Sequence, residues 1–161
     1  MVASNADPGR KTAQVAADEL AELGFRTNVR NVPQDTLYTK FCGVPKRAVA
    51  ICPNVGWFKD FQDAESMLQP TFAGSAIKPA GNVNWSQLAD DETDAAMAKA
   101  SLLPLGDTRN QAWADVNRMI VEQAPAVPWV WDDNFQLRSK DINGVMNDYT
   151  TSWDLNYSSV K

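Results

Sequence analysis

Apolar residues in the first third of the chain follow helical and extended periods in turn. Residues 8–24 carry small and apolar side chains at helical spacing between Pro-Gly and a single Gly, which predicts a helix. Residues 25–32 alternate apolar with polar side chains, which predicts a strand with one buried face. A short helix over 33–41 and an interior strand over 47–52 are predicted next. This rhythm favours an α/β domain with a partly parallel sheet.

The pattern changes after residue 60 to helices separated by polar connections. Asp63 is predicted to cap a short helix that begins beside it. Residues 69–89 are rich in Pro, Gly, Ser and Asn, which predicts a long surface connection of the kind that often carries function. Further helices are predicted over 90–103 and 106–125, and acidic residues in the first turn of the former suit the helix dipole.

The helix predicted over 106–125 has a buried face formed by Trp113, Val116 and Ile120. A strand over 127–131 is predicted to follow it, with its two tryptophans on one side, in the core or at a hinge. The remaining residues contain only β-like fragments with little of their own to pack against. They are therefore predicted to need another surface for burial.

Composition allows one globular domain and excludes several classes of protein. The chain has 161 residues, of which 44% are hydrophobic and 22% charged, enough for one domain with a genuine core. Its 15 basic and 20 acidic residues give a net charge of −5 without a basic tract, which argues against binding nucleic acid or an anionic membrane. Without a signal peptide at its start, the chain is expected to be cytosolic, or else a mature or truncated part of a longer precursor.

Histidine and cysteine usage limits the chemistry further. The sequence contains no histidine, which removes Ser-His-Asp and Cys-His catalysis and the commonest transition-metal ligand. Two cysteines are too few for a four-thiolate zinc site, so no metal and no cofactor are predicted. Cys42 and Cys52 are either free buried thiols or a disulfide that closes a short loop, and the disulfide is favoured if the compartment is oxidising.

Four segments together resemble one known family. They are, in chain order, AADELAELGFRTNVRNV, GWFKDFQDAESML, NVNWSQLADDETDAAMAKA and RNQAWADVNRMIVEQAPAVPWVWDDNFQLRSKDINGV. Their order and spacing over 10–145 resemble the C-terminal lobe of the family 5 extracellular solute-binding proteins, the dipeptide, oligopeptide and nickel receptors of ABC importers. The chain departs from the family pattern at Asp63-Ala64, where Asp-Pro is usual, and at Trp85, where tyrosine is frequent.

The resemblance implies a fold and a domain organisation. The fold is one lobe of a type II periplasmic-binding-protein-like architecture, an α/β domain with a mixed sheet flanked by helices. Residues 1–133 would form the C-terminal ligand-binding lobe. Residues 134–161 would be a tail that returns to the other lobe in the full-length protein, so the chain is expected to be a fragment.

The resemblance also implies a role and a set of partners. The chain would be a non-enzymatic substrate-binding component that holds a small solute, in the first instance a peptide, between two lobes. Its partners would be the missing N-terminal lobe and the membrane permease of an ABC importer, with no nucleic acid. The location would be periplasmic or extracellular, with a lipid anchor on the full-length protein.

The segment GWFKD carries the candidate ligand chemistry. Asp60 matches the family aspartate that holds the free amino terminus of a peptide, through a charge-assisted hydrogen bond. Gly56 would permit close approach of the backbone, and Trp57 would stack on the ligand. The alternatives are that Asp60 is an ordinary loop or capping acid and that Trp57 belongs to the core, where Phe58 and Phe61 are expected.

A second pair of candidates lies in the polar connection. Asn84 and Trp85 would contact the ligand at the rim of the site, because a large aromatic residue in a polar surface connection needs a reason to be there. The alternative for both residues is packing against the lobe.

Two other functions compete with transport. Asp60 and Asp63, near several tryptophans, are the candidate acid and base of a glycoside hydrolase. The six tryptophans also suit a carbohydrate-binding module, although the helix–strand rhythm argues against the β-sandwich that such modules usually adopt.

Overall fold

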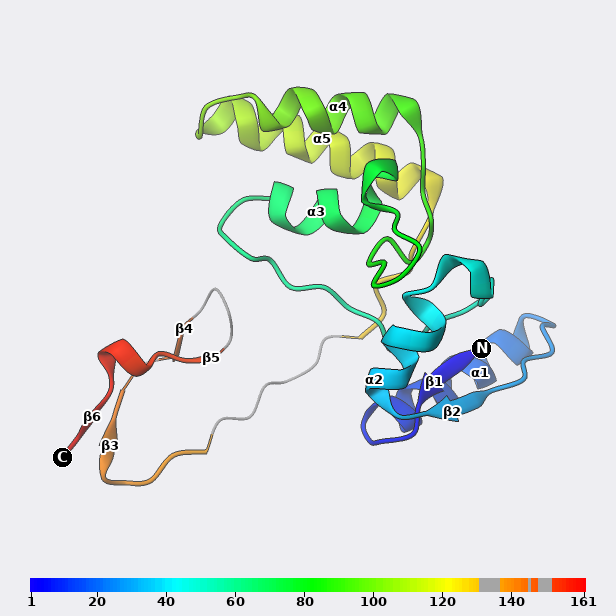
Figure 1. The fold of residues 1–161 in the computed structure, drawn as a ribbon, viewed down its shortest axis with the longest axis horizontal. Helices are drawn as coiled ribbons and strands as arrows, with labels where there is room; N and C mark the ends of the chain where they lie inside the picture. The colour runs from blue at the N-terminus through cyan, green and yellow to red at the C-terminus, as the bar shows by residue number, and fades with distance from the viewer. Residues whose placement is uncertain (131–136, 145, 148–151) are drawn as a thin grey trace.

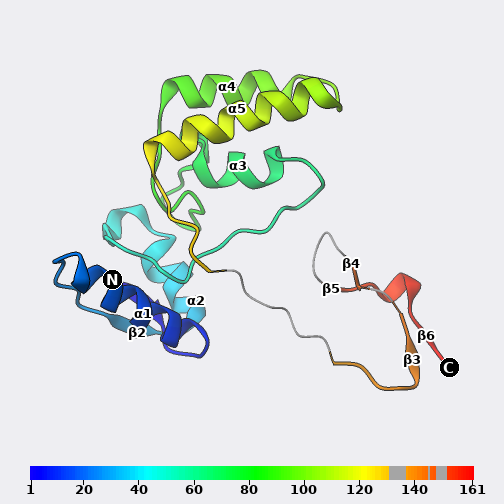
Figure 2. The ribbon, with the colours of Figure 1, turned by 180° about the vertical axis from the view of Figure 1, so that it is seen from behind.

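A computed structural model describes residues 1–130, 137–144, 146–147 and 152–161. It contains an N-terminal α/β unit, a layer of three helices, and a C-terminal segment of short strands (Figure 1). Figure 2 shows the molecule from behind: α3 lies beside α4 and α5, and these helices are separate from the N-terminal unit. The predicted α/β class is confirmed, but the described residues form three two-stranded sheets rather than one mixed sheet.

The N-terminal unit is built on two parallel strands. Strand β1 (Val2–Ser4) pairs with β2 (Arg30–Val32), and α1 (Gly9–Glu22) connects them, as the predicted helix over 8–24 required. The strand predicted over 25–32 is confirmed only for its last three residues. Residues 2–4 are buried throughout, and nothing in the sequence analysis predicted a strand there.

The helix predicted over 33–41 is present in a modified form. Helix α2 (Gln34–Thr36) continues directly into a π-helical turn, η1 (Leu37–Cys42). Leu37 is fully buried, and it packs in a cluster with Val2 of β1, Val32 of β2 and Cys42. The π-helical turn thus brings Cys42 into the small N-terminal core.

The interior strand predicted over 47–52 is wrong. The 3₁₀ turn η2 (Pro45–Arg47) occupies its start, and Ala48 has a left-handed backbone with φ of 46°. Both features break the extended conformation that a strand requires. The stretch still contacts β1 through a backbone hydrogen bond of 3.1 Å from Val2 N to the Ile51 carbonyl.

Cys42 and Cys52 form the predicted disulfide. It joins the end of η1 to the segment that leads toward the GWFKD stretch. Among the described residues no cysteine is free. The bond therefore fixes the start of the candidate site to the N-terminal core.

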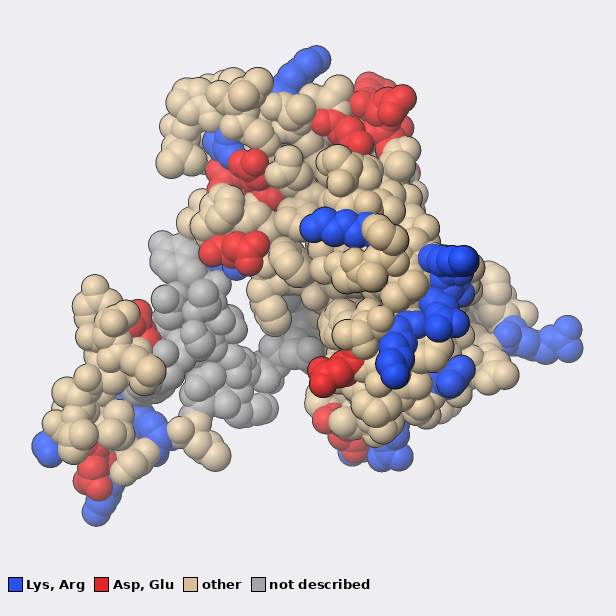
Figure 3. All heavy atoms as spheres, viewed as in Figure 1, with Lys and Arg blue, Asp and Glu red and all other residues tan. Residues whose placement is uncertain are grey.

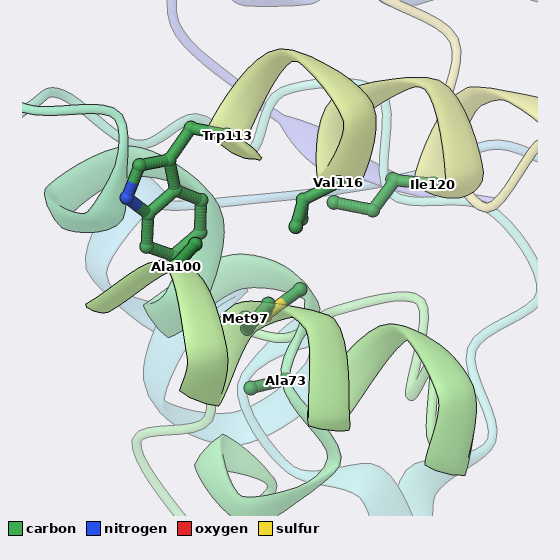
Figure 4. Packing of buried hydrophobic residues seen from close by; sticks show 6 residues of the cluster. All are labelled: Ala73, Met97, Ala100, Trp113, Val116 and Ile120. Atoms are coloured by element: carbon green, nitrogen blue, oxygen red, sulfur yellow. The ribbon is translucent and has the colours of Figure 1, made fainter. Parts of the chain in front are cut away.

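The helical layer consists of α3 (Glu65–Phe72), α4 (Asp91–Ser101) and α5 (Asp107–Gln123). Their shared core is shown in Figure 4, where α5 side chains face α4 and the residue after α3. The buried members of this core are Ala73, Met97, Ala100, Trp113, Val116 and Ile120. The helices predicted over 90–103 and 106–125 are confirmed, as is the predicted buried face of the second.

The connection predicted over 69–89 begins later than predicted and is partly buried, although residues 77–89 form no helix or strand. Helix α3 extends to Phe72, and a 3₁₀ turn, η3 (Gly74–Ala76), follows it. Asn82 and Asn84 are 1% and 0% exposed. Polar residues lie inside here because their side chains replace the missing backbone hydrogen bonds of an irregular segment.

The C-terminal segment forms two small antiparallel pairs. Its strands are β3 (Ile142–Asn143), β4 (Met146–Asn147), β5 (Ser152–Trp153) and β6 (Ser159–Val160), with a 3₁₀ turn, η4 (Leu155–Tyr157), before β6. Strand β3 pairs with β6, and β4 with β5. The predicted strand over 127–131 is absent from its described part, 127–130, where Trp129 is 40% exposed and so lies outside the core. Trp131 lies outside the described residues.

A basic and an acidic group of side chains stand out on the face shown in Figure 3. Exposed Lys40, Lys46 and Arg47 lie on η1 and η2, where blue side chains gather. Exposed Asp91 and Glu92 lie in the first turn of α4, where they stabilise the positive end of the helix dipole. Across the described residues, no helix has both the length and the apolar character needed to cross a bilayer.

Candidate functional site

The segment from Gly56 to Gln62 joins the N-terminal unit to α3 as an irregular loop. Asp60 is exposed, and no hydrogen bond or ion pair with another described residue engages its carboxylate. Phe58 and Phe61 are 76% and 53% exposed, so the expectation that they belong to the core is wrong. The loop thus presents one free carboxylate between two exposed aromatic rings.

Gly56 starts this loop on the side of the N-terminal unit. Its N–H donates to the Tyr38 hydroxyl at 3.2 Å, and the space where a Cβ would lie is open. Asn54 holds the preceding turn, because its Oδ1 accepts from Ser4 N at 2.9 Å and its Nδ2 donates to Thr12 Oγ1 at 3.1 Å. Sequence analysis missed Asn54, since its partners lie in β1 and α1.

Trp57 is half-buried and fixed in orientation. Its indole Nε1 donates to the Ser66 carbonyl at 3.0 Å, which ties the start of the loop to the first turn of α3. Ser66 is 3% exposed, and its Oγ lies 2.9 Å from the carbonyl oxygens of Phe61 and Asp63. The buried residue Ser66 therefore contacts both ends of the loop, through its carbonyl at Trp57 and through its hydroxyl at Phe61 and Asp63.

Asp63 ends the loop as a buried, paired carboxylate. Its Oδ1 accepts from Glu65 N at 2.9 Å, close to the predicted capping role, although Ala64 separates it from the first residue of α3. Its side chain is 7% exposed and bonds Arg109 at 2.6 Å. Hydrogen bonds from Arg109 hold the pKa of Asp63 below its usual value, against the opposing effect of burial. A buried carboxylate paired with arginine is not free to act as the acid or base of a glycosidase.

Arg109 is a second residue of this region that was not predicted from the sequence. It is 5% exposed at the start of α5, and its guanidinium lies 5.9 Å from the Trp113 ring. The signal was present, because position 109 continues the buried stripe of Trp113, Val116 and Ile120 at helical spacing. An arginine on such a stripe predicts a buried ion pair.

Asn84 is not a rim residue in this structure. Its Nδ2 donates to the carbonyls of Ala73 and Leu88 at 3.0 and 2.8 Å, and its Oδ1 accepts from Ser86 Oγ and Leu88 N. The Asn84 side chain is itself fully buried, and both its amide nitrogen and its amide oxygen are hydrogen-bonded within the fold. The alternative of packing against the lobe describes Asn84 correctly.

Trp85 lies on the other side of the same turn, half-buried against the N-terminal core. Its ring is 6.0 Å from the ring of Tyr38 and tilted by 51°. Since the Tyr38 hydroxyl accepts from Gly56 N–H, Trp85 is linked through Tyr38 to the first residue of the loop.

Two hollows of the described surface are lined by residues other than the predicted ligand residues. One, of about 360 Å³, lies between α3 and α5 and is lined by Met67, Leu68 and Trp113, among others. The second lies on the C-terminal segment. Within the described ranges, no cluster of acidic or sulfur-bearing side chains is suited to hold a metal ion.

The lowered pKa of Asp63 predicts a loss of stability in acid. Because its folded-state pKa lies below the ordinary value near 4, the contribution is complete above about pH 4 and is lost as pH falls through the folded-state pKa. Urea unfolding midpoints measured from pH 7 to pH 2.5 should fall more steeply below about pH 4 in the wild type than in Asp63→Asn. Parallel midpoint curves for the two proteins would contradict this prediction.

Comparisons with known proteins agree with the resemblance found in the sequence. No protein-family model matches the chain. The chain is 24% identical over 132 residues to a Pseudomonas aeruginosa (strain UCBPP-PA14) protein described as "Probable di/tripeptide-binding protein 5", a match that covers 82% of the chain and 24% of that relative.

A solved structure extends this similarity to the fold. The chain matches "Clavulanic acid biosynthesis oligopeptide binding protein 2" with a TM-score of 0.90 at 22% identity, over 99% of this chain and 30% of that one. The chain thus spans about a quarter of the curated relative and under a third of the solved structure. The resemblance to peptide-binding solute-binding proteins is confirmed, and the chain has the fold of a segment of an oligopeptide-binding protein.

Proposed function

We propose that the chain is one lobe of a two-lobed, non-enzymatic solute-binding protein that delivers a di- or tripeptide to the permease of an ABC importer. The name of the curated relative and the order of the four sequence segments support this proposal. The disulfide suits an oxidising compartment outside the cytoplasmic membrane, in the periplasm or at the cell surface with a lipid anchor.

The observation that carries the proposal is the free carboxylate of Asp60. It stands exposed on a loop whose backbone is held from behind by buried groups, so a ligand can reach it without breaking an existing ion pair. A peptide α-ammonium placed against it would make a charge-assisted hydrogen bond, which is short and strong when water is excluded. Closure of a second lobe over the loop would exclude that water.

Other loop residues would shape the contact. Trp57 offers a fixed ring face, and the open space at Gly56 leaves room for the ligand backbone. Trp85 would support this side of the site through Tyr38. The exposed rings of Phe58 and Phe61 would be covered when the lobes close.

The boundary proposed between lobe and tail, 1–133 and 134–161, has support in the C-terminal segment. Its strands are two residues long, too short to be stable as isolated pairs in water. Several of its apolar side chains are 74–101% exposed, namely Leu137, Leu155, Tyr157 and Val160. In the proposed protein these side chains would be buried against the second lobe.

Calorimetry on the proposed two-lobed protein tests the role of Asp60. A tripeptide with a free amino terminus should bind the wild type more tightly than its N-acetylated form. Asp60→Asn should weaken binding of the free tripeptide by about 10- to 100-fold, since a hydrogen bond to a charged group contributes about 1.5–3 kcal/mol. Binding of the acetylated peptide should change little.

Asp107→Asn is the matched control, because this exposed acid lies on α5 and should leave both affinities unchanged. Equal affinity of the wild type for the two peptides would overturn the role of Asp60. The 161-residue chain alone should bind tripeptides in the millimolar range or more weakly, since it supplies only one wall of the site. Micromolar binding by the chain alone would contradict the two-lobed proposal.

A further inference from the structure

The loop that carries Asp60 is anchored at its far end by a single buried arginine. The guanidinium of Arg109 donates through Nε and Nη2 to the two carboxylate oxygens of Asp63, at 2.6 and 3.1 Å. Nη2 also donates to Glu65 Oε2. Asp63 is near the end of the loop and Glu65 is the first residue of α3, so one side of the guanidinium binds the junction between loop and helix.

The opposite side of the same guanidinium is attached to the end of α4. Its Nη1 lies 2.9, 2.8 and 3.0 Å from the carbonyl oxygens of Ala100, Ser101 and Leu103. These carbonyls belong to the last residues of α4 and the turn after it, at the negative end of the helix dipole, where a cation is stabilising. Arg109 therefore fixes the end of the loop relative to α4 and α5 rather than relative to α3 alone.

The geometry of the loop transmits this constraint to Asp60. Only two residues separate Asp60 from Asp63, so their Cα atoms lie no more than about 11 Å apart. Within that short distance, Ser66 Oγ contacts the carbonyls of Phe61 and Asp63, and the Ser66 carbonyl accepts from Trp57. A shift of Asp63 would therefore move both Asp60 and the Trp57 ring.

We propose that Arg109 is a positioning residue for the ligand carboxylate: it sets where Asp60 stands, and so sets the preference for ligands with a free amino terminus. This inference rests on the proposed function. Lysine cannot replace Arg109 in this role, since an ammonium lacks the planar fork that reaches two acids and three carbonyls at once. The charge of the side chain would be kept while its geometry is lost.

A purely structural role for Arg109 predicts something different. If the arginine served stability alone, Arg109→Lys would lower the unfolding midpoint and leave the folded site as it is. The ratio of affinities for a free and an N-acetylated tripeptide would then be unchanged. That ratio is the decisive measurement, because it depends on the position of Asp60 and not on the amount of folded protein.

The experiment is calorimetry of the proposed two-lobed protein with the two tripeptides, at a temperature where each variant is folded by circular dichroism. Arg109→Lys should reduce the free-to-acetylated affinity ratio about 10-fold, chiefly by weakening binding of the free peptide. Ser66→Ala, which keeps the ion pair but removes the hydroxyl behind Phe61, should reduce the ratio in the same direction and serves if Arg109→Lys does not fold. Arg118→Lys, an exposed change on the same helix, should leave it unaltered.

The outcomes separate this inference from the function on which it rests. If the wild type shows no preference for the free peptide, the proposed function fails. If the wild type shows the preference and folded Arg109→Lys retains it, the function stands and the positioning role is wrong. Where Arg109→Lys does not fold, retention of the preference by Ser66→Ala has the same meaning. A loss of affinity shared equally by both peptides would likewise overturn the positioning role.

Discussion

Replacing Trp113 with alanine is expected to destabilise the chain by about 3–5 kcal/mol, the usual cost of removing a large aromatic side chain from a core. Trp113 is 2% exposed and belongs to the core cluster of the helical layer, where it lies beside Ala100 of α4 (Figure 4). Its ring also lies beside the guanidinium of Arg109. The truncation would thus open a cavity next to the ion pair that ends the Asp60 loop.

Urea unfolding followed by far-ultraviolet circular dichroism measures this loss. Val121→Ala is the control, since Val121 lies on the same helix with 65% of its surface exposed and should change the free energy of unfolding by no more than about 0.5 kcal/mol. Equal unfolding free energies for Trp113→Ala and Val121→Ala would show that the helical layer is not the stabilising core of the chain.

Sequence patterns predicted the helices well and the strands poorly, for a physical reason. The spacing of Trp113, Val116 and Ile120 along one face is a local property, so it can be recognised without knowing what the face packs against. Strand β1 is only three residues long, and it exists because it pairs with β2 far along the chain. The apolar run at 47–52 wrongly predicts a strand, because a hydrophobic pattern does not show that the backbone of Ala48 is left-handed.

In the candidate site, too, local features could be predicted from the sequence, whereas features that depend on distant residues could not. The capping tendency of Asp63 was predictable from its place before a helix, whereas its partner Arg109 is 46 residues away in the sequence. The exposure of Phe58 and Phe61 follows from the short loop that holds them, which hydrophobicity alone cannot reveal. The sequence wrongly predicts a rim position for Asn84, because composition predicts an exposed connection wherever Asn, Gly and Pro are frequent.

The fully buried amide of Asn84 leads to the second large effect. Its Nδ2 is the donor that satisfies two carbonyls, those of Ala73 and Leu88. Asn84→Asp keeps the shape of the side chain but places an oxygen where that donor was. At neutral pH the variant would bury a negative charge against two carbonyl oxygens, and each lost bond to a buried group costs about 1–3 kcal/mol. We expect Asn84→Asp to lose at least about 3 kcal/mol of stability at pH 7.

The pH dependence of this loss gives it a distinctive signature. Burial beside carbonyl oxygens would raise the folded-state pKa of the new carboxyl group above its unfolded value near 4, so the penalty should grow as pH rises above about 4 and shrink in acid, where the group is protonated. Urea midpoints at pH 4 and pH 7 measure the difference, and Asn117→Asp on the exposed side of α5 is the matched control. If Asn84→Asp were as stable as Asn117→Asp at pH 7, the turn around Asn84 would have to be open to water. The rim position first predicted for this residue would then be correct after all.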